Sequence, residues 1–142
     1  MNDEAKKFVE QTLQRTAAKR ARAAQLAAEY PDAICLVKEQ PHVTGRPWYG
    51  CAVHRSARNT GKWQVSFFDS DGFAYDFSEP TYEAAIYEAL KECTTVDMTR
   101  LDRAIQEPDF MAGVIWSMLP DDKKWTTRLA DVREEERARR CR

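Results

Sequence analysis

Residues 63–77, with the sequence WQVSFFDSDGFAYDF, decide the fold class of this chain. Large apolar side chains alternate with polar or small ones on both sides of the central DSDG, which is the period-two pattern of a strand with one buried face. The side chains predicted to face the core are Trp63, Val65, Phe67, Phe73, Tyr75 and Phe77. Asp71-Gly72 is a hairpin signal, because glycine accepts the positive φ of a tight turn. This stretch therefore predicts two antiparallel strands.

A further strand is expected just before this hairpin. In residues 48–54 the side chains of Tyr49, Cys51 and Val53 alternate with others and are the expected core face. Asn59-Thr60-Gly61 supplies the turn into the next strand. Residues 33–38, AICLVK, form either a short strand or an irregular apolar plug. The central part of the chain thus predicts a three-stranded antiparallel meander.

A long helix is expected in front of the meander. Residues 3–29 are rich in alanine and free of glycine and proline, and the helix should stop before Pro31, because a residue that precedes proline disfavours the helical region. Its few large apolar residues are Phe8, Val9, Leu13 and Leu26. The helix therefore either packs closely through its small residues or is only partly covered.

Helices also follow the meander. Residues 78–93 predict a helix that Ser78 or Thr81 caps and that lies on the sheet. Further helices are expected over 98–106, 109–119 and from 122 onward. The prediction is an α+β fold, with a helix-strand-strand-strand-helix core over 1–93 and C-terminal helices over 94–142. The length of the chain favours one domain that contains both parts.

The charge of the chain is balanced overall and uneven locally. Its 142 residues carry 22 basic and 23 acidic side chains, for a net charge of −1. Residues 1–62 hold an excess of positive charge, whereas residues 63–92 hold seven acids and the single base Lys91. A strongly basic nucleic-acid-binding domain is excluded, but a locally charged interface is not.

Two charged surfaces are candidate partner-binding sites, and each is otherwise a solvated face. An acidic surface would engage a basic groove that normally holds nucleic acid; it comprises Asp69, Asp71, Asp76, Glu79, Glu83 and Glu88. A basic surface on the first helix and the 55–62 turn would contact an acidic protein patch or phosphate; it comprises Arg15, Lys19, Arg22, Arg55, Arg58 and Lys62.

The second face of the sheet offers a possible apolar interface. Trp48 and Phe68 point away from the predicted core face, and aromatic side chains dominate the centres of protein interfaces. The alternative is that the C-terminal helices cover this face, which would make both residues part of the core.

Chemistry at a metal or a nucleophile is not expected. Cys35, His42, Cys51 and His54 are four possible ligands within twenty residues, but an i, i+3 pair such as Cys51 and His54 on one strand points to opposite faces. The four cysteines, which include Cys141, match neither a metal motif nor a disulfide framework and are expected to be reduced. The motifs of common hydrolases, nucleotide-binding proteins and metalloproteases are absent from the sequence. We expect no cofactor, no metal and no enzymatic activity.

The expected location is the cytoplasm. No apolar run approaches the ~20 residues of a membrane span, and the first ten residues lack the apolar core of a secretory signal.

The order helix, three strands, helix over 3–93 is similar to the topology of the double-stranded RNA-binding domain. That family contacts RNA phosphates with lysines at the start of its second helix. The corresponding residues 78–90 contain Glu79, Glu83 and Glu88 and no lysine, so no RNA contact is carried over.

Residues 63–90 also resemble small phage proteins of an αβα-sandwich type. The shared pattern is a Trp-x-Val-x-Phe strand, a hairpin, and a helix opened by threonine with Ala-Ile at its centre. The resemblance implies a phage or mobile-element accessory protein, a group that includes anti-CRISPR proteins. We expect a non-enzymatic inhibitor of a host protein complex. The alternatives are a nucleic-acid-binding protein that uses the first helix and the 55–62 turn, and a structural adaptor that oligomerises through its C-terminal helices.

Overall fold

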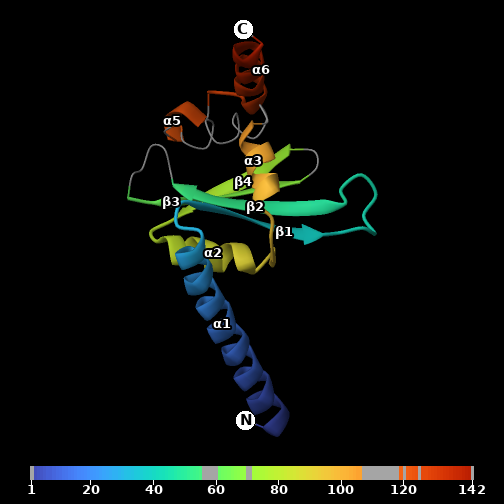
Figure 1. The fold of residues 1–142 in the computed structure, drawn as a ribbon, viewed down its shortest axis with the longest axis vertical. Helices are drawn as coiled ribbons and strands as arrows, with labels where there is room; N and C mark the ends of the chain where they lie inside the picture. The colour runs from blue at the N-terminus through green and yellow to red at the C-terminus, as the bar shows by residue number, and fades with distance from the viewer. Residues whose placement is uncertain are drawn as a thin grey trace.

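A computed structural model describes residues 2–55, 61–69, 72–106, 119, 121–124 and 126–141. It has the expected α+β fold, in which a long helix precedes an antiparallel sheet and further helices follow (Figure 1). The elements are α1 (Asp3–Glu29), β1 (Ala33–Glu39), β2 (Trp48–Arg55), β3 (Trp63–Asp69), β4 (Gly72–Glu79), α2 (Tyr82–Leu90), β5 (Thr95–Val96), α3 (Met98–Gln106), α5 (Asp121–Lys124) and α6 (Leu129–Arg140). The helix predicted over 109–119 lies outside the described residues.

The sheet has five strands in the order β4-β3-β2-β1-β5, and all pairings are antiparallel. The three predicted strands are β2, β3 and β4. Residues 33–38, for which the sequence left open a strand or an irregular apolar plug, belong to the strand β1, which pairs along its whole length with β2. The two-residue strand β5, which the sequence did not indicate, pairs with Leu36 and Val37. Four strands, rather than three, therefore separate α1 from α2.

The main core lies between one face of the sheet and the helices α1 and α2. The end of α1 near the sheet and α2 lie on the same face (Figure 1). Alternation on the strands holds as predicted for β2 and β3, whose buried side chains on this face are Cys51, Val53, Val65 and Phe67. The helices supply Ala23, Leu26, Ala85, Ile86, Ala89 and Leu90.

Strand β4 departs from strict alternation. Its register is Tyr75 opposite Phe67, then Phe73 opposite Phe68, with an irregularity between Phe67 and Phe68. A bulge of this kind inserts one residue and shifts the pattern. The strict alternation predicted for residues 73–77 is therefore interrupted between Phe73 and Tyr75. Tyr75 stacks on Phe67 with ring centroids 4.7 Å apart, yet it remains 50% exposed on this outermost strand.

A second, smaller core covers the opposite face of the sheet. It contains Cys35, Val37, Ala52, Phe68 and Leu101, of which Leu101 comes from α3. Met98, at the start of α3, contacts both cores. The sheet is thus packed on both faces by described residues.

Helix α1 has the bounds that the sequence predicts. The side chain of Asn2 caps its first turn by accepting a hydrogen bond from the Ala5 N–H at 2.7 Å, and the helix ends just before Pro31. Its buried residues, Ala23 and Leu26, lie near the C-terminal end. Residues 3–18, which we call the projecting half of α1, extend away from the sheet and from α2 (Figure 1).

The described C-terminal helices are short. In α6 the side chains of Val132 and Glu136 are buried, and Glu136 pairs with Arg139 at 2.7 Å. Among the described residues, none of the helices combines the length and the apolar character needed to cross a membrane.

Candidate interaction surfaces

An exposed apolar patch lies on the projecting half of α1. Phe8 is 69% exposed, Val9 43% and Leu13 64%. The sequence left open whether α1 is closely packed or partly covered, and the structure shows that it is partly covered. Three large apolar side chains within six residues of one helix form a patch of the kind that marks protein contact sites.

The basic residues of α1 follow directly after this patch. Arg15 and Arg22 are exposed, and Lys19 is half-buried. The Arg20 guanidinium lies 4.6 Å from the centre of the Tyr87 ring on α2, so Arg20 marks the point where α2 begins to cover α1. No acidic residue occurs between positions 11 and 28. We call Arg15, Lys19, Arg20 and Arg22 the basic segment of α1.

The second part of the predicted basic surface lies at the end of the sheet. Arg55 and Lys62 are exposed, whereas Arg58 lies outside the described residues. The Arg55 guanidinium sits 4.6 Å from the Trp63 ring, which in turn stacks on Tyr82 with centroids 4.0 Å apart. Tyr82 donates a hydrogen bond to the carbonyl oxygen of Tyr30, just beyond the C-terminal end of α1. The basic end of the sheet is therefore joined to the helix that carries the basic segment.

The predicted acidic surface is divided among several local contacts. Asp69 pairs with Arg46 at 3.6 Å and Glu88 pairs with Lys91 at 3.0 Å. Asp76 accepts a hydrogen bond from the Gln64 amide at 2.6 Å on the face of the sheet opposite α1.

The remaining acidic residues lie at the other end of β4. Glu79 is half-buried at the end of this strand, and Glu83 is exposed in the first turn of α2. Asp71 lies outside the described residues. Because Asp69 and Glu79 belong to opposite ends of the β3–β4 pair, the structure does not gather the acidic residues into one surface.

On the second face of the sheet the structure favours the alternative in which Phe68 is part of a core, with Trp48 packed against it. Phe68 is 2% exposed and contacts the half-buried Trp48 edge-to-face, with centroids 5.6 Å apart. The Arg100 guanidinium lies 4.6 Å from the Trp48 ring. Sequence reasoning left open whether a helix covers this face, and Leu101 of α3 contributes to that cover.

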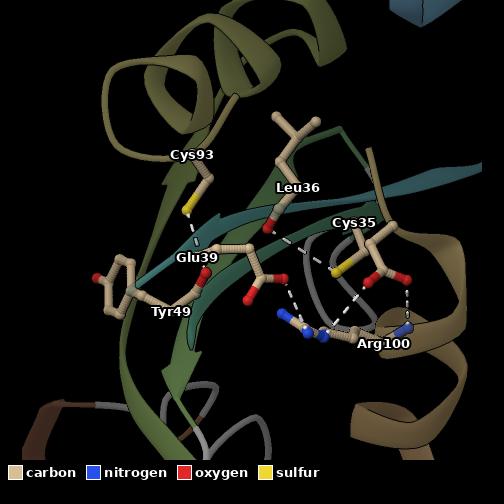
Figure 2. Close-up of polar contacts among 7 residues, drawn as sticks. Cys35, Leu36, Glu39, Tyr49, Cys93 and Arg100 are labelled. Atoms are coloured by element: carbon tan, nitrogen blue, oxygen red, sulfur yellow. Dashed lines mark hydrogen bonds and ion pairs between the residues drawn. The ribbon is translucent and has the colours of Figure 1, made fainter. Parts of the chain in front are cut away.

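Arg100 links α3 to the sheet through charge. It forms ion pairs with Glu39 at 2.9 Å and with Asp97 at 3.3 Å (Figure 2). Its own backbone N–H donates to the Asp97 side chain at 3.2 Å. These contacts of Arg100 with two carboxylates and an aromatic ring anchor α3 against β1.

The cysteines do not form a metal site. Cys51 belongs to the main core and Cys35 to the second core, on the opposite face of the sheet, while His42 is exposed in the loop after β1. Within the part of the chain that the structure describes, no group of three potential ligands could hold a metal ion.

Burial also makes these thiols poor nucleophiles. It raises the pKa of Cys35 to about 12 and that of Cys93 to about 12, and it raises the pKa of Cys51 well above its usual value. The Cys93 thiol donates to the Tyr49 carbonyl oxygen at 3.7 Å, and the Cys35 thiol to that of Leu36 at 3.9 Å (Figure 2). Cys141 is exposed. The reactive form of cysteine is the thiolate, so the three buried thiols are unreactive at neutral pH.

One polar contact that sequence reasoning missed resembles a catalytic pair. The Nε2 atom of His54 lies 3.4 Å from the Ser66 hydroxyl, and its Nδ1 atom lies 3.0 Å from the Arg55 carbonyl oxygen. Because a carbonyl only accepts, Nδ1 carries the proton and Nε2 can accept from Ser66. However, Ser66 has no exposed surface, and burial lowers the pKa of His54. The contact satisfies buried polar groups and does not present a nucleophile.

No protein-family model, no curated protein and no solved structure matches this chain.

Proposed function

We propose that this protein is a non-enzymatic binding protein that inhibits or recruits a host protein complex, in the manner of phage and mobile-element accessory proteins, and that the basic segment of α1 makes the contact. The observation that carries the proposal is the position of this segment. Its positive charges lie next to an exposed apolar patch on a helix whose first half projects from the fold.

The chemistry of the segment favours an acidic protein surface as the target. Four basic side chains without an intervening acid create a local positive potential, which steers a charged partner and selects against other positive surfaces. Arg55 and Lys62, at the basic end of the sheet, supply further positive charge.

Capture from a lysate of the host cell tests this proposal. The tagged protein should retain a specific partner that R15E/R22E fails to retain. The matched control is R103E/K123E, which removes the same charge at exposed positions on α3 and α5. If the control loses the partner to the same extent, net charge rather than the basic segment controls binding, and the assignment is wrong. The triple variant E79K/E83K/E88K is expected to keep the partner, whereas its loss would favour the acidic surface.

A second candidate function is direct nucleic-acid binding through the same basic segment. The observation in its favour is that the segment and Arg55 lie on connected elements and could follow a phosphate backbone. Phosphate binding weakens steeply as salt rises, because condensed counterions are released. A gel shift at low salt that disappears at moderate salt, and a captured complex that nuclease treatment destroys, would favour this candidate.

A further inference from the structure

The exposed apolar patch on α1 continues a face that is buried elsewhere along the same helix. Steps of three and four residues lead from the buried Leu26 and Ala23 through the half-buried Lys19 and Thr16 and then Thr12 to Val9. Residues at these spacings share one face of an α-helix. The face that packs against the core near the C-terminal end of α1 therefore lacks such cover in the projecting half.

The charges beside this face change sign along the helix. Asp3 and Glu4 are acidic, whereas Arg15 and Lys19 are basic. Glu4 precedes Phe8 by four residues, and Lys19 follows Phe8 by eleven, which are both close to whole numbers of helical turns. Glu4 and Lys19 thus lie on the same side of the helix as Phe8, Glu4 near the start of the projecting half and Lys19 just beyond its end.

We propose that the projecting half of α1 pairs antiparallel with the same segment of a second copy, which forms a two-fold symmetric homodimer. An antiparallel pair centred between residues 3 and 19 sets Glu4 of each copy beside Lys19 of the other, and it brings Val9 opposite Leu13. A parallel pair would instead set Glu4 level with Glu4 and Lys19 level with Lys19, so it would bring no opposite charges together. The order of charges therefore selects both the occupant and its direction, because a two-fold interface must be complementary to itself.

The length of the projecting half suits this arrangement. Residues 3 to 19 span about 24 Å at ~1.5 Å per residue. The overlap ends at Arg20, where Tyr87 of α2 begins to cover the helix. The second copy can therefore lie along the apolar face of the first copy as far as Arg20, where α2 of the first copy begins to cover the helix.

The dimer adds a property that the proposed function does not require. It presents two basic segments, one at each end of the helix pair, and each segment carries more positive charge than the facing Asp3 and Glu4 neutralise. Two linked contacts with one target raise the apparent affinity without any new contact in either site. The dimer is nevertheless independent of which partner the basic segment binds.

Sedimentation over a concentration series tests the apolar part of the interface. The wild-type chain should pass from monomer to dimer, and Leu13→Glu should weaken the dimer by about tenfold or more. Gln14→Glu adds the same charge on the opposite side of the helix and should leave the dimer unchanged. Leu13 is exposed in the single chain, so its replacement is expected to leave the thermal midpoint of the monomer unaltered. A wild-type chain that stays monomeric at every concentration overturns the proposal.

A charge-swap experiment tests the direction of the pair. Glu4→Lys alone places two pairs of like charges in the dimer, and so does Lys19→Glu, so each variant should fail to self-associate. An equimolar mixture of the two variants restores both opposite-charge pairs and should recover the mass of a dimer. The control mixture of Glu10→Lys with Lys7→Glu changes the same charges away from the apolar face, and its components should dimerise with or without mixing. If the first mixture remains monomeric, or if either variant dimerises alone as well as the wild type does, the antiparallel pair is wrong.

Discussion

Phe67 lies at the centre of the main core and is 2% exposed. Its ring stacks on Tyr49, Tyr75 and Phe77 with centroid distances of 5.6, 4.7 and 5.9 Å. The alternation in residues 63–69 was sufficient to predict this position, because the two faces of a strand differ in burial along its whole length. Phe8 has the same side chain and is 69% exposed, a difference that depends on what packs against each residue.

This contrast gives a prediction about single residues. Phe67→Ala should lower the free energy of unfolding by about 3–5 kcal/mol, because it removes buried apolar surface and leaves a cavity. Phe8→Ala should change it by less than about 0.5 kcal/mol, since an exposed side chain of a monomer contributes little to stability. Urea denaturation of both variants, at a concentration where the chain is monomeric, measures the two values. Equal losses would mean that Phe8 is packed in solution.

Helix caps determine where α1 and α2 begin. Thr81 caps α2 by accepting a hydrogen bond from the Ala84 N–H at 3.1 Å. Of the two predicted capping residues, Ser78 and Thr81, the structure therefore selects Thr81. Asn2 caps α1 in the same way. The two caps differ in their surroundings, because the first turn of α2 adjoins the main core through Tyr82, whereas the first turn of α1 lies at the end of the projecting half.

We therefore expect the two caps to contribute differently to stability. Thr81→Ala should lower the free energy of unfolding by about 1 kcal/mol, the usual effect of losing a capping side chain. Asn2→Ala should leave it unchanged within ~0.3 kcal/mol and should reduce only the helical signal in circular dichroism, because fraying of a projecting turn is a local opening. A loss of global stability in Asn2→Ala would show that the projecting half folds together with the core.

At the scale of the whole molecule, the sheet divides the interior into two cores, and each contains buried thiols. Cys35 lies in the second core, and Cys51 and Cys93 lie in the main core. Burial raises the pKa of both Cys35 and Cys93 from 9.0 to about 12. The folded state therefore holds these protons more tightly than the unfolded chain does.

The free energy of unfolding should therefore fall at high pH. The stabilisation is fully present below about pH 9, the unfolded pKa, and is lost as the pH rises toward about 12, because only the unfolded chain releases the protons there. Between these limits each thiol should reduce the free energy of unfolding by about 1.4 kcal/mol per pH unit. Denaturation at about pH 8 and about pH 10.5 measures the slope, and Cys35→Ala should decrease it by the share of one thiol. Equal slopes in the wild type and the variant would contradict the burial of Cys35.

Much of this fold follows from local sequence. The bounds of α1 depend on Asn2, on the alanine-rich stretch and on Pro31, which act within a few residues of themselves. The strands β2 and β3 follow from alternation, and the α+β class follows from the order of these elements.

Other features depend on residues that are distant in sequence. Phe68 is buried in a cluster that includes Leu101 of α3, and the strand β5 exists because β1 offers it hydrogen bonds. The predicted acidic residues separate because Asp69 and Glu79 lie at opposite ends of one strand pair. Sequence alone therefore determined the elements, through interactions within single helices and turns. Only the tertiary structure decided which faces are covered and left Phe8, Val9 and Leu13 exposed, because burial is set by contacts between elements.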